Sequence, residues 1–138
     1  MPPLESNLNE SRNYLDQMER GLRDKLRVTD FIPESAQTIL DVGCANGILT
    51  RAVARTFPKK LVKGIDLNAQ FIAEAQGKDT GVSEPEFEKV FLRTLRERGA
   101  RYDAILFTSV LHEFYTYGGG MAAVLKGIAD AYRILEPG

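Results

Sequence analysis

The stretch TILDVGCANGILTRAVARTF, residues 38–57, decides the fold. Its first five residues are mostly apolar with β-branched side chains, which is typical of a short strand buried on both faces of a sheet. Small residues follow at two-residue spacing, as a tight turn requires: Gly43, Ala45 and Gly47. Apolar residues then recur at helical spacing, with Arg51 and Arg55 on the other face of the helix. Strand, small-residue turn and helix together predict the nucleotide-binding corner of a Rossmann-like fold.

A second signal lies downstream of this corner. Residues 61–65 read as another short strand, and Asp66 follows it, 19 residues after Gly47. In a Rossmann unit, an acidic residue about 20 positions beyond the turn accepts hydrogen bonds from ribose hydroxyls. Unpaired N–H groups at the start of the helix would face a polar part of the same ligand. The two motifs together predict a nucleoside-binding site.

In these two motifs and in two later ones, the sequence resembles the class I S-adenosylmethionine-dependent methyltransferases. ILDVGCANG (39–47) looks like their first motif, with Ala45 in place of the usual middle glycine. GIDLN (64–68) looks like the second motif, with Asp66 as the ribose ligand. YDAILFTSVLHEF (102–114) resembles the strand-four motif, and AYRILEPG (131–138) resembles the helix and turn before strand five. A nicotinamide-binding protein fits less well, because its turn is usually GxGxxG and the corner here is GxAxG.

The resemblance implies S-adenosylmethionine as the cofactor and an unidentified methyl acceptor as the substrate. Asp41 would support the turn and the methionyl end of the cofactor. The cofactor-binding positions that the resemblance implies are Asp41, Gly43, Cys44, Ala45, Gly47, Asp66, Leu67 and Ser109. No metal site is expected. The alternative function is a non-catalytic or truncated module that binds the cofactor or serves assembly.

The expected fold class is α/β, a Rossmann-like parallel sheet with flanking helices. We expect an N-terminal helical segment over residues 1–37 and the N-terminal part of the cofactor-binding domain over residues 38–138. Strands five to seven of the family would follow Gly138, so the edge of strand four would be unpaired and open to association with another chain.

After Asp66, Asn68 is expected to cap a short helix whose Phe71, Ile72 and Ala75 face inward.

The third strand of the family is expected either to be absent or to lie in a segment that has been removed or left out of this chain. Ten residues separate Gln76 from Phe87, and none of them forms a convincing strand. SEPE (83–86) instead predicts the cap of a helix that continues to Gly99. Asp79 is the nearby acidic candidate for the contact with adenine that the family makes after its third strand.

His112, the only histidine, is the candidate catalytic residue. It follows the buried strand predicted over residues 102–108, which resembles strand four of the family. Ligands of open α/β sheets sit beyond the carboxyl ends of the strands. An imidazole titrates near neutrality, so His112 could take a proton from the acceptor. The alternative is that His112 and Glu113 begin the next helix and orient the loop.

Two further segments each have two interpretations. Residues 8–28 predict an amphipathic helix that either packs on the sheet or closes over the cofactor, with Tyr14 and Phe31 as the residues that a closing helix would bring to the site. The most basic segment is either a solvated helix face or a contact for substrate or nucleic acid. Its arginines are Arg93, Arg96, Arg98 and Arg101.

Composition places the chain in a broad class. It has 138 residues, 43% hydrophobic and 27% charged, as expected for one globular domain. The net charge of −1 gives no overall attraction to nucleic acid or to anionic membranes. Cys44 is the single cysteine, so an internal disulfide is excluded. With no signal peptide and no membrane-spanning run, we expect a cytoplasmic protein without a membrane partner.

Overall fold

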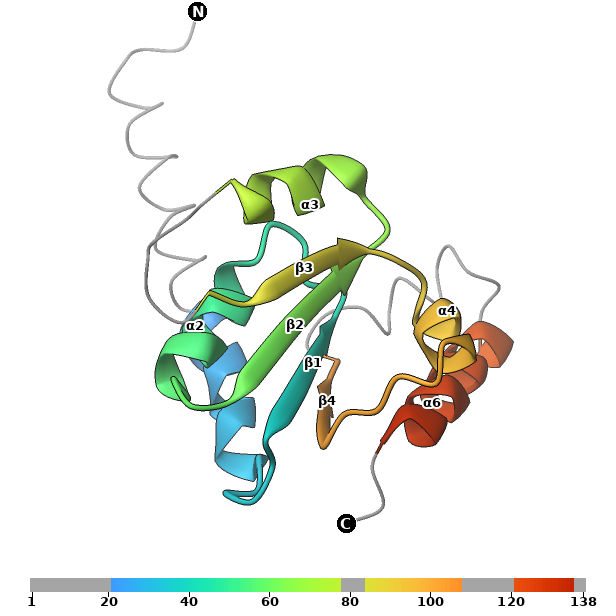
Figure 1. Cartoon of the computed structure of the whole chain (residues 1–138), viewed down its shortest axis with the longest axis horizontal. Helices are drawn as coiled ribbons and strands as arrows, with labels where there is room; N and C mark the ends of the chain where they lie inside the picture. The colour runs from blue at the N-terminus through green and yellow to red at the C-terminus, as the bar shows by residue number, and fades with distance from the viewer. Residues whose placement is uncertain (1–20, 78–83, 108–120, 136–138) are drawn as a thin grey trace, which may run out of the picture.

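The computed structural model describes residues 21–77, 84–107 and 121–135 (Figure 1). Its centre is a parallel sheet in the order β3-β2-β1-β4. The strands are β1 (Thr38–Val42), β2 (Leu61–Asp66), β3 (Glu86–Lys89) and β4 (Ala104–Leu106). Asp41 is paired in register with Gly64 and with Leu106, so the carboxyl ends of these strands meet along one edge of the sheet.

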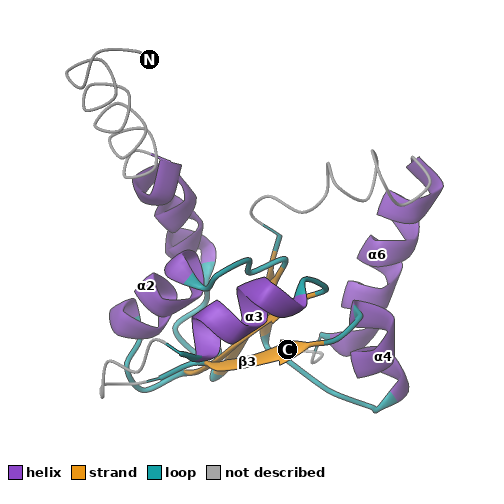
Figure 2. Ribbon diagram, turned by 90° about the horizontal axis from the view of Figure 1, so that it is seen from above, coloured by secondary structure: helices purple, strands orange, loops and turns teal. Residues whose placement is uncertain are grey.

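Helices cover both faces of the sheet. They are α2 (Ile48–Thr56), α3 (Ala69–Gln76), α4 (Leu92–Glu97) and α6 (Met121–Ile134). Residues 21–26 are also helical and lead into the 3-10 helix η1 (Arg27–Phe31). In Figure 2, α4 and α6 lie together, apart from α2 and α3.

The strands alternate between two cores, as a sheet buried on both faces requires. Ile39 packs with Leu49 and Val53 of α2 on one face. Leu40, next in sequence, packs with Leu95 and Ile134 on the other face. The predicted α/β class, a parallel sheet with flanking helices, is confirmed.

The described part of the N-terminal segment packs on the face that α2 covers. Leu22, Leu26, Val28 and Ile32 contact the core of that face. Phe31 is 84% exposed, and Tyr14 lies outside the described residues. The division at residue 37 stays a prediction.

The expectation of a missing third strand is wrong. Residues 86–89 form β3, which pairs with β2 through Gly64 and Phe87, and α4 begins only at Leu92. In EPEFE (84–88), charged and apolar residues alternate, which is the period of a strand. Glu86 and Glu88 therefore share one face, where both reach Lys63 of β2, at 3.5 Å and 2.7 Å.

Two other details differ from expectation. Phe71, placed inward together with Ile72 and Ala75, is exposed, whereas the other two are buried. The fourth strand is shorter than the predicted 102–108, and Tyr102 instead donates its N–H to the carbonyl of Ile134 (3.0 Å). The described helices include none long and apolar enough to cross a membrane.

Asn68 caps α3, as the sequence predicts. Its Oδ1 accepts hydrogen bonds from the N–H groups of Gln70 (3.0 Å) and Phe71 (3.1 Å). Asn68→Ala should lower the free energy of unfolding by about 1 kcal/mol in urea denaturation, because both donors lose this partner. Gln70→Ala, which changes only an exposed side chain beside the cap, is the control. Equal losses in the two variants would contradict the capping role.

Candidate functional site

The small-residue turn lies at the carboxyl edge of β1 and β2 and has an unusual backbone. Gly43 (φ 77°), Ala45 (φ 49°) and Gly47 (φ 85°) are all in the left-handed region. For alanine this region costs roughly 1–2 kcal/mol, so Ala45 needs a compensating contact. The N–H of Ala45 donates to Oδ2 of Asp66 at 2.9 Å, which supplies that contact.

Asp66 joins the turn to the segment after β2. Its Oδ1 accepts from the N–H of Asn68 at 2.9 Å, while its Oδ2 holds Ala45. The N–H groups of Gly43 and Cys44 both donate to the carbonyl of Ile65, each at 2.9 Å. The structure thus brings together the two motifs that the sequence singled out. Each carboxylate oxygen of Asp66 can still accept a further hydrogen bond.

Asp41, the last but one residue of β1, is a buried carboxylate. It is 1% exposed, and its Oδ2 accepts from the hydroxyl of Thr50 at 2.7 Å. Its Oδ1 is buried and has no partner among the described residues. Burial raises the pKa of Asp41 from 3.8 to about 6, against the opposing effects of Thr50 and Lys25. A buried acceptor of this kind fits a ligand that carries a hydrogen-bond donor or a positive charge.

The ring of Phe87, in β3, packs against the turn. A Cβ atom at Gly47 would lie 2.6 Å from Cζ of Phe87, and one at Gly64 would lie 2.9 Å from its Cδ1. The ring therefore fits against two glycines, one from the turn and one from β2. Sequence reasoning missed this role because it placed Phe87 on a helix. The alternation of charged and apolar residues in EPEFE (84–88) was the signal that could have found it.

The structure also corrects the expected position of Arg51. It was expected on the other face of α2, away from the apolar residues, but it is 5% exposed. Its guanidinium pairs with Glu84, donates to the carbonyl of Ala75, and lies 5.3 Å from the centre of the Phe87 ring. These partners offset the cost of burying the charge and tie α2 to the end of α3 and to the start of β3.

Cys44 is a packing residue. It is buried, and its side chain lies against Gly64. Burial, together with the nearby charges of Asp41 and Asp66, raises the pKa of the thiol to about 12. The thiol therefore stays protonated near neutral pH and is a poor nucleophile.

Exposed apolar residues border the same edge of the sheet. Leu67 follows Asp66 directly and is half exposed. Phe91 is 60% exposed and lies two residues beyond β3, at the start of α4. Sequence reasoning missed Phe91 because it joined β3 and α4 into one helix. Apolar groups beside carboxylates suit a ligand that has a flat ring and a polar sugar.

The remaining candidate site residues are not among those that the structure describes. Ser109, His112 and Asp79 lie outside the described residues, so their roles stay predictions. Among the described residues, no three or more His, Cys, Asp or Glu side chains are grouped so that they could hold a metal ion.

Known proteins match most of the chain. A family model described as a methyltransferase domain matches residues 39–138. A mitochondrial ubiquinone biosynthesis O-methyltransferase from Candida albicans is 35% identical over 68 residues, 45% of this chain and 21% of the relative. A ribosomal RNA large subunit methyltransferase G from Magnetococcus marinus is 28% identical over 123 residues, 88% of this chain and 32% of the relative.

A solved structure extends these matches to the fold. It is that of a SAM-bound amino pentose methyltransferase from Micromonospora echinaspora, with a TM-score of 0.67 and 27% identity. The match covers 91% of this chain and 52% of that protein. The chain thus spans about half of the solved protein, and a third or less of the two curated relatives. The resemblance found in the sequence is confirmed.

The buried carboxyl of Asp41 makes stability depend on pH. The folded state holds the proton more tightly than the unfolded state, so this group favours folding most below about pH 4. As the pH rises from 3.8 to about 6, the free energy of unfolding should fall by about 3 kcal/mol. Asp41→Asn lacks this fall, so urea denaturation of both proteins from pH 4 to 7 should give diverging curves. Parallel curves would contradict the raised pKa.

The contact between Phe87 and the turn can be separated from backbone strain. Gly47 and Gly99 both have a positive φ, but a Cβ at Gly99 meets nothing within 4 Å. Gly99→Ala should cost about 1–2 kcal/mol from strain alone. Gly47→Ala should cost about 1–3 kcal/mol more because it also strikes the ring.

The double variant Gly47→Ala/Phe87→Leu tests the cause of this difference. A smaller side chain at position 87 should recover part of the extra loss in urea denaturation. No recovery, or equal costs at positions 47 and 99, would show that the ring does not constrain the turn.

Proposed function

Because the chain belongs to the methyltransferase domain family, we propose that it binds S-adenosylmethionine at the turn of residues 43–47 and takes part in methyl transfer to an acceptor. S-adenosylmethionine is the cofactor of this family. The observation that carries the proposal is the hydrogen bond between the N–H of Ala45 and Asp66, because it joins both cofactor motifs in one site.

The described residues fit the parts of this cofactor. Asp66 would accept hydrogen bonds from the ribose hydroxyls with its remaining lone pairs. The unpartnered Oδ1 of Asp41 suits the positively charged methionyl end. The left-handed turn of Gly43, Ala45 and Gly47 keeps side chains small where a ligand approaches the backbone.

The adenine ring would lie on apolar surface. Leu67 and Phe91 supply such surface at the carboxyl edge of β2 and β3. Cys44 would contribute its backbone to the turn, since its thiol is buried. Ser109 is proposed to border the same site from the segment after β4.

The bound cofactor supplies an electrophilic methyl group on its sulfonium. The protein therefore needs mainly to align the acceptor and exclude water. We propose His112 as the group that takes the proton from the acceptor, because it follows β4 at the carboxyl edge. The acceptor itself is not assigned, because the matched methyltransferases are named for different ones. The proposed compartment is the cytoplasm.

An alternative function is a cofactor-binding or assembly module that performs no methyl transfer itself. It is favoured by the position of β4 at the edge of the sheet that the structure describes. In this alternative, the outer edge of β4 would associate with another chain.

Calorimetric titration with S-adenosylmethionine and S-adenosylhomocysteine tests the proposed site. The wild-type chain should bind both, and Asp66→Ala should abolish binding because it removes the ribose acceptor and the partner of Ala45. Asp30→Ala, the same change at an exposed position of η1, should bind normally. Normal binding by Asp66→Ala would refute the ribose assignment.

Saturation with ligand should also raise stability. At ~100 times its dissociation constant, a ligand adds about 2.7 kcal/mol, a shift of several degrees in a thermal melt. His112→Ala separates the two functions: it should lower methyl transfer in an enzyme while leaving cofactor binding unchanged. Unchanged transfer in this variant would remove His112 as the base.

A further inference from the structure

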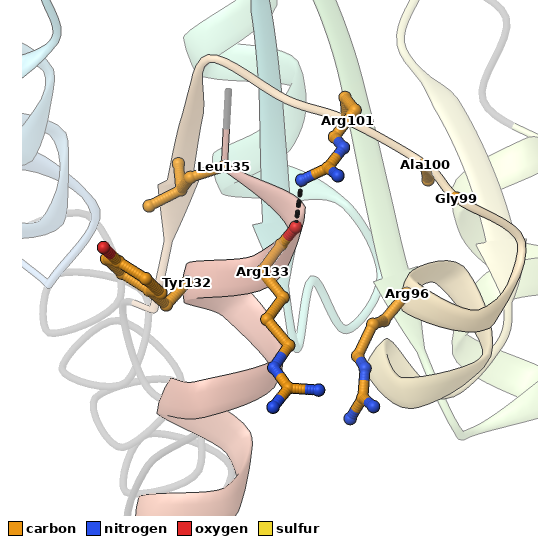
Figure 3. Close-up of a pocket in the computed structure, with 7 residues that line it drawn as sticks. All are labelled: Arg96, Gly99, Ala100, Arg101, Tyr132, Arg133 and Leu135. Carbon is orange, nitrogen blue, oxygen red and sulfur yellow. Dashed lines mark hydrogen bonds between the residues drawn. The ribbon is translucent and has the colours of Figure 1, made fainter. Parts of the chain in front are cut away.

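A cleft lies at the opposite edge of the sheet from the cofactor turn. It is formed by the end of α4, by the loop between α4 and β4, and by the end of α6 with the residue that follows it, and has a volume of about 610 Å³ (Figure 3). Its lining residues are Arg96, Gly99, Ala100, Arg101, Tyr132, Arg133 and Leu135. Three of these seven are arginines, and none is acidic.

The structure sorts the basic segment seen in the sequence into two groups. Arg93 pairs with Glu97 at 3.8 Å and Arg98 pairs with Glu88 at 2.7 Å, and neither lines the cleft. Arg96 and Arg101 do line it, and Arg133 joins them from α6. The sequence could not indicate this trio, because Arg133 lies far along the chain from the other two.

Two of the three guanidinium groups are held in place. Arg96 donates to Asp130 of α6 at 2.7 Å. Arg101 donates to the backbone carbonyl of Arg133, at the end of α6. Each contact uses part of a five-donor group and leaves other N–H donors available. Because these side chains are already ordered, a ligand would pay less entropy to engage them.

Arg133 carries a positive charge that is not paired with any acidic side chain among the described residues. Its guanidinium has no ion pair or side-chain hydrogen bond with the part of the chain that the structure describes. In Figure 3 it extends in the same direction as the guanidinium of Arg96. Asp130 offsets one of the three positive charges, so the described side chains leave a surplus of two.

We propose that this cleft binds a phosphate ester. A guanidinium matches the oxygens of a phosphate with paired N–H donors. Arg96 presents such donors from α4, Arg101 from the loop before β4, and Arg133 from α6. The phosphate is either part of an RNA backbone or carried by a small phosphorylated compound. This site is separate from the cofactor turn and does not rest on the proposed methyl transfer.

The test uses the full chain and two probes. Fluorescence anisotropy measures binding of a fluorescein-labelled oligouridylate, and calorimetry measures binding of glycerol 3-phosphate. Arg133→Gln should weaken binding about tenfold, because a charged hydrogen-bond donor is lost. Arg93→Gln removes the same charge from an exposed arginine outside the cleft and should leave affinity within about twofold.

Two readouts distinguish a ligand contact from a structural role. Arg133→Lys keeps the charge and should retain more affinity than Arg133→Gln. For the oligouridylate, the slope of log affinity against log salt should decrease by about 0.7 in Arg133→Gln. Tighter binding of the oligouridylate assigns RNA as the source of the phosphate, whereas equal binding of both probes assigns a small phosphorylated compound.

Two results would contradict the proposal. If the wild-type chain binds neither probe, the proposal is overturned. If Arg93→Gln weakens binding as much as Arg133→Gln, the attraction is diffuse and the cleft is not the site. Thermal melts of all variants confirm that each is folded when binding is measured.

Discussion

The carboxylate of Asp66 is the interaction on which the candidate site depends. It accepts one N–H from Ala45 and one from Asn68, and so ties the turn after β1 to the start of α3. A hydrogen bond to a charged group contributes roughly 1.5–3 kcal/mol, which is enough to offset the left-handed conformation of Ala45. The contact that shapes the site therefore also stabilises the backbone around it.

Close packing beneath the turn imposes the second constraint. The ring of Phe87 lies where Gly47 and Gly64 have no side chain, and Arg51 covers the ring from α2. β3 thus limits how closely the turn can pack, although this strand is four residues long and lies at the edge of the sheet. On its other face, Glu86 and Glu88 place charges along this edge strand, which disfavours pairing with a foreign strand.

The two candidate sites, at opposite ends of the sheet, present groups of opposite charge. Asp41 and Asp66 lie at the carboxyl edge, where a positively charged cofactor fits. Arg101 and Arg133 line the cleft at the other edge. The net charge of −1, from 18 basic and 19 acidic residues, does not reveal this separation. Local charge therefore says more about ligands of this chain than its total does.

The sequence by itself determined the features that depend on neighbouring residues. The strand, the turn and α2 follow from one stretch, the spacing to Asp66 predicts the second motif, and Asn68 caps α3 through its own backbone neighbours. Only the tertiary structure decided the role of β3, because the alternation of charged and apolar residues over 84–88 is too short to stand out beside the helix that follows. It also decided the burial of Arg51, since Ala75 and Glu84 reach that side chain only after the chain has folded. Ser109 and His112 stay predictions from the sequence. Local patterns record contacts between near neighbours, whereas charges and rings from distant segments meet only when the sheet has formed.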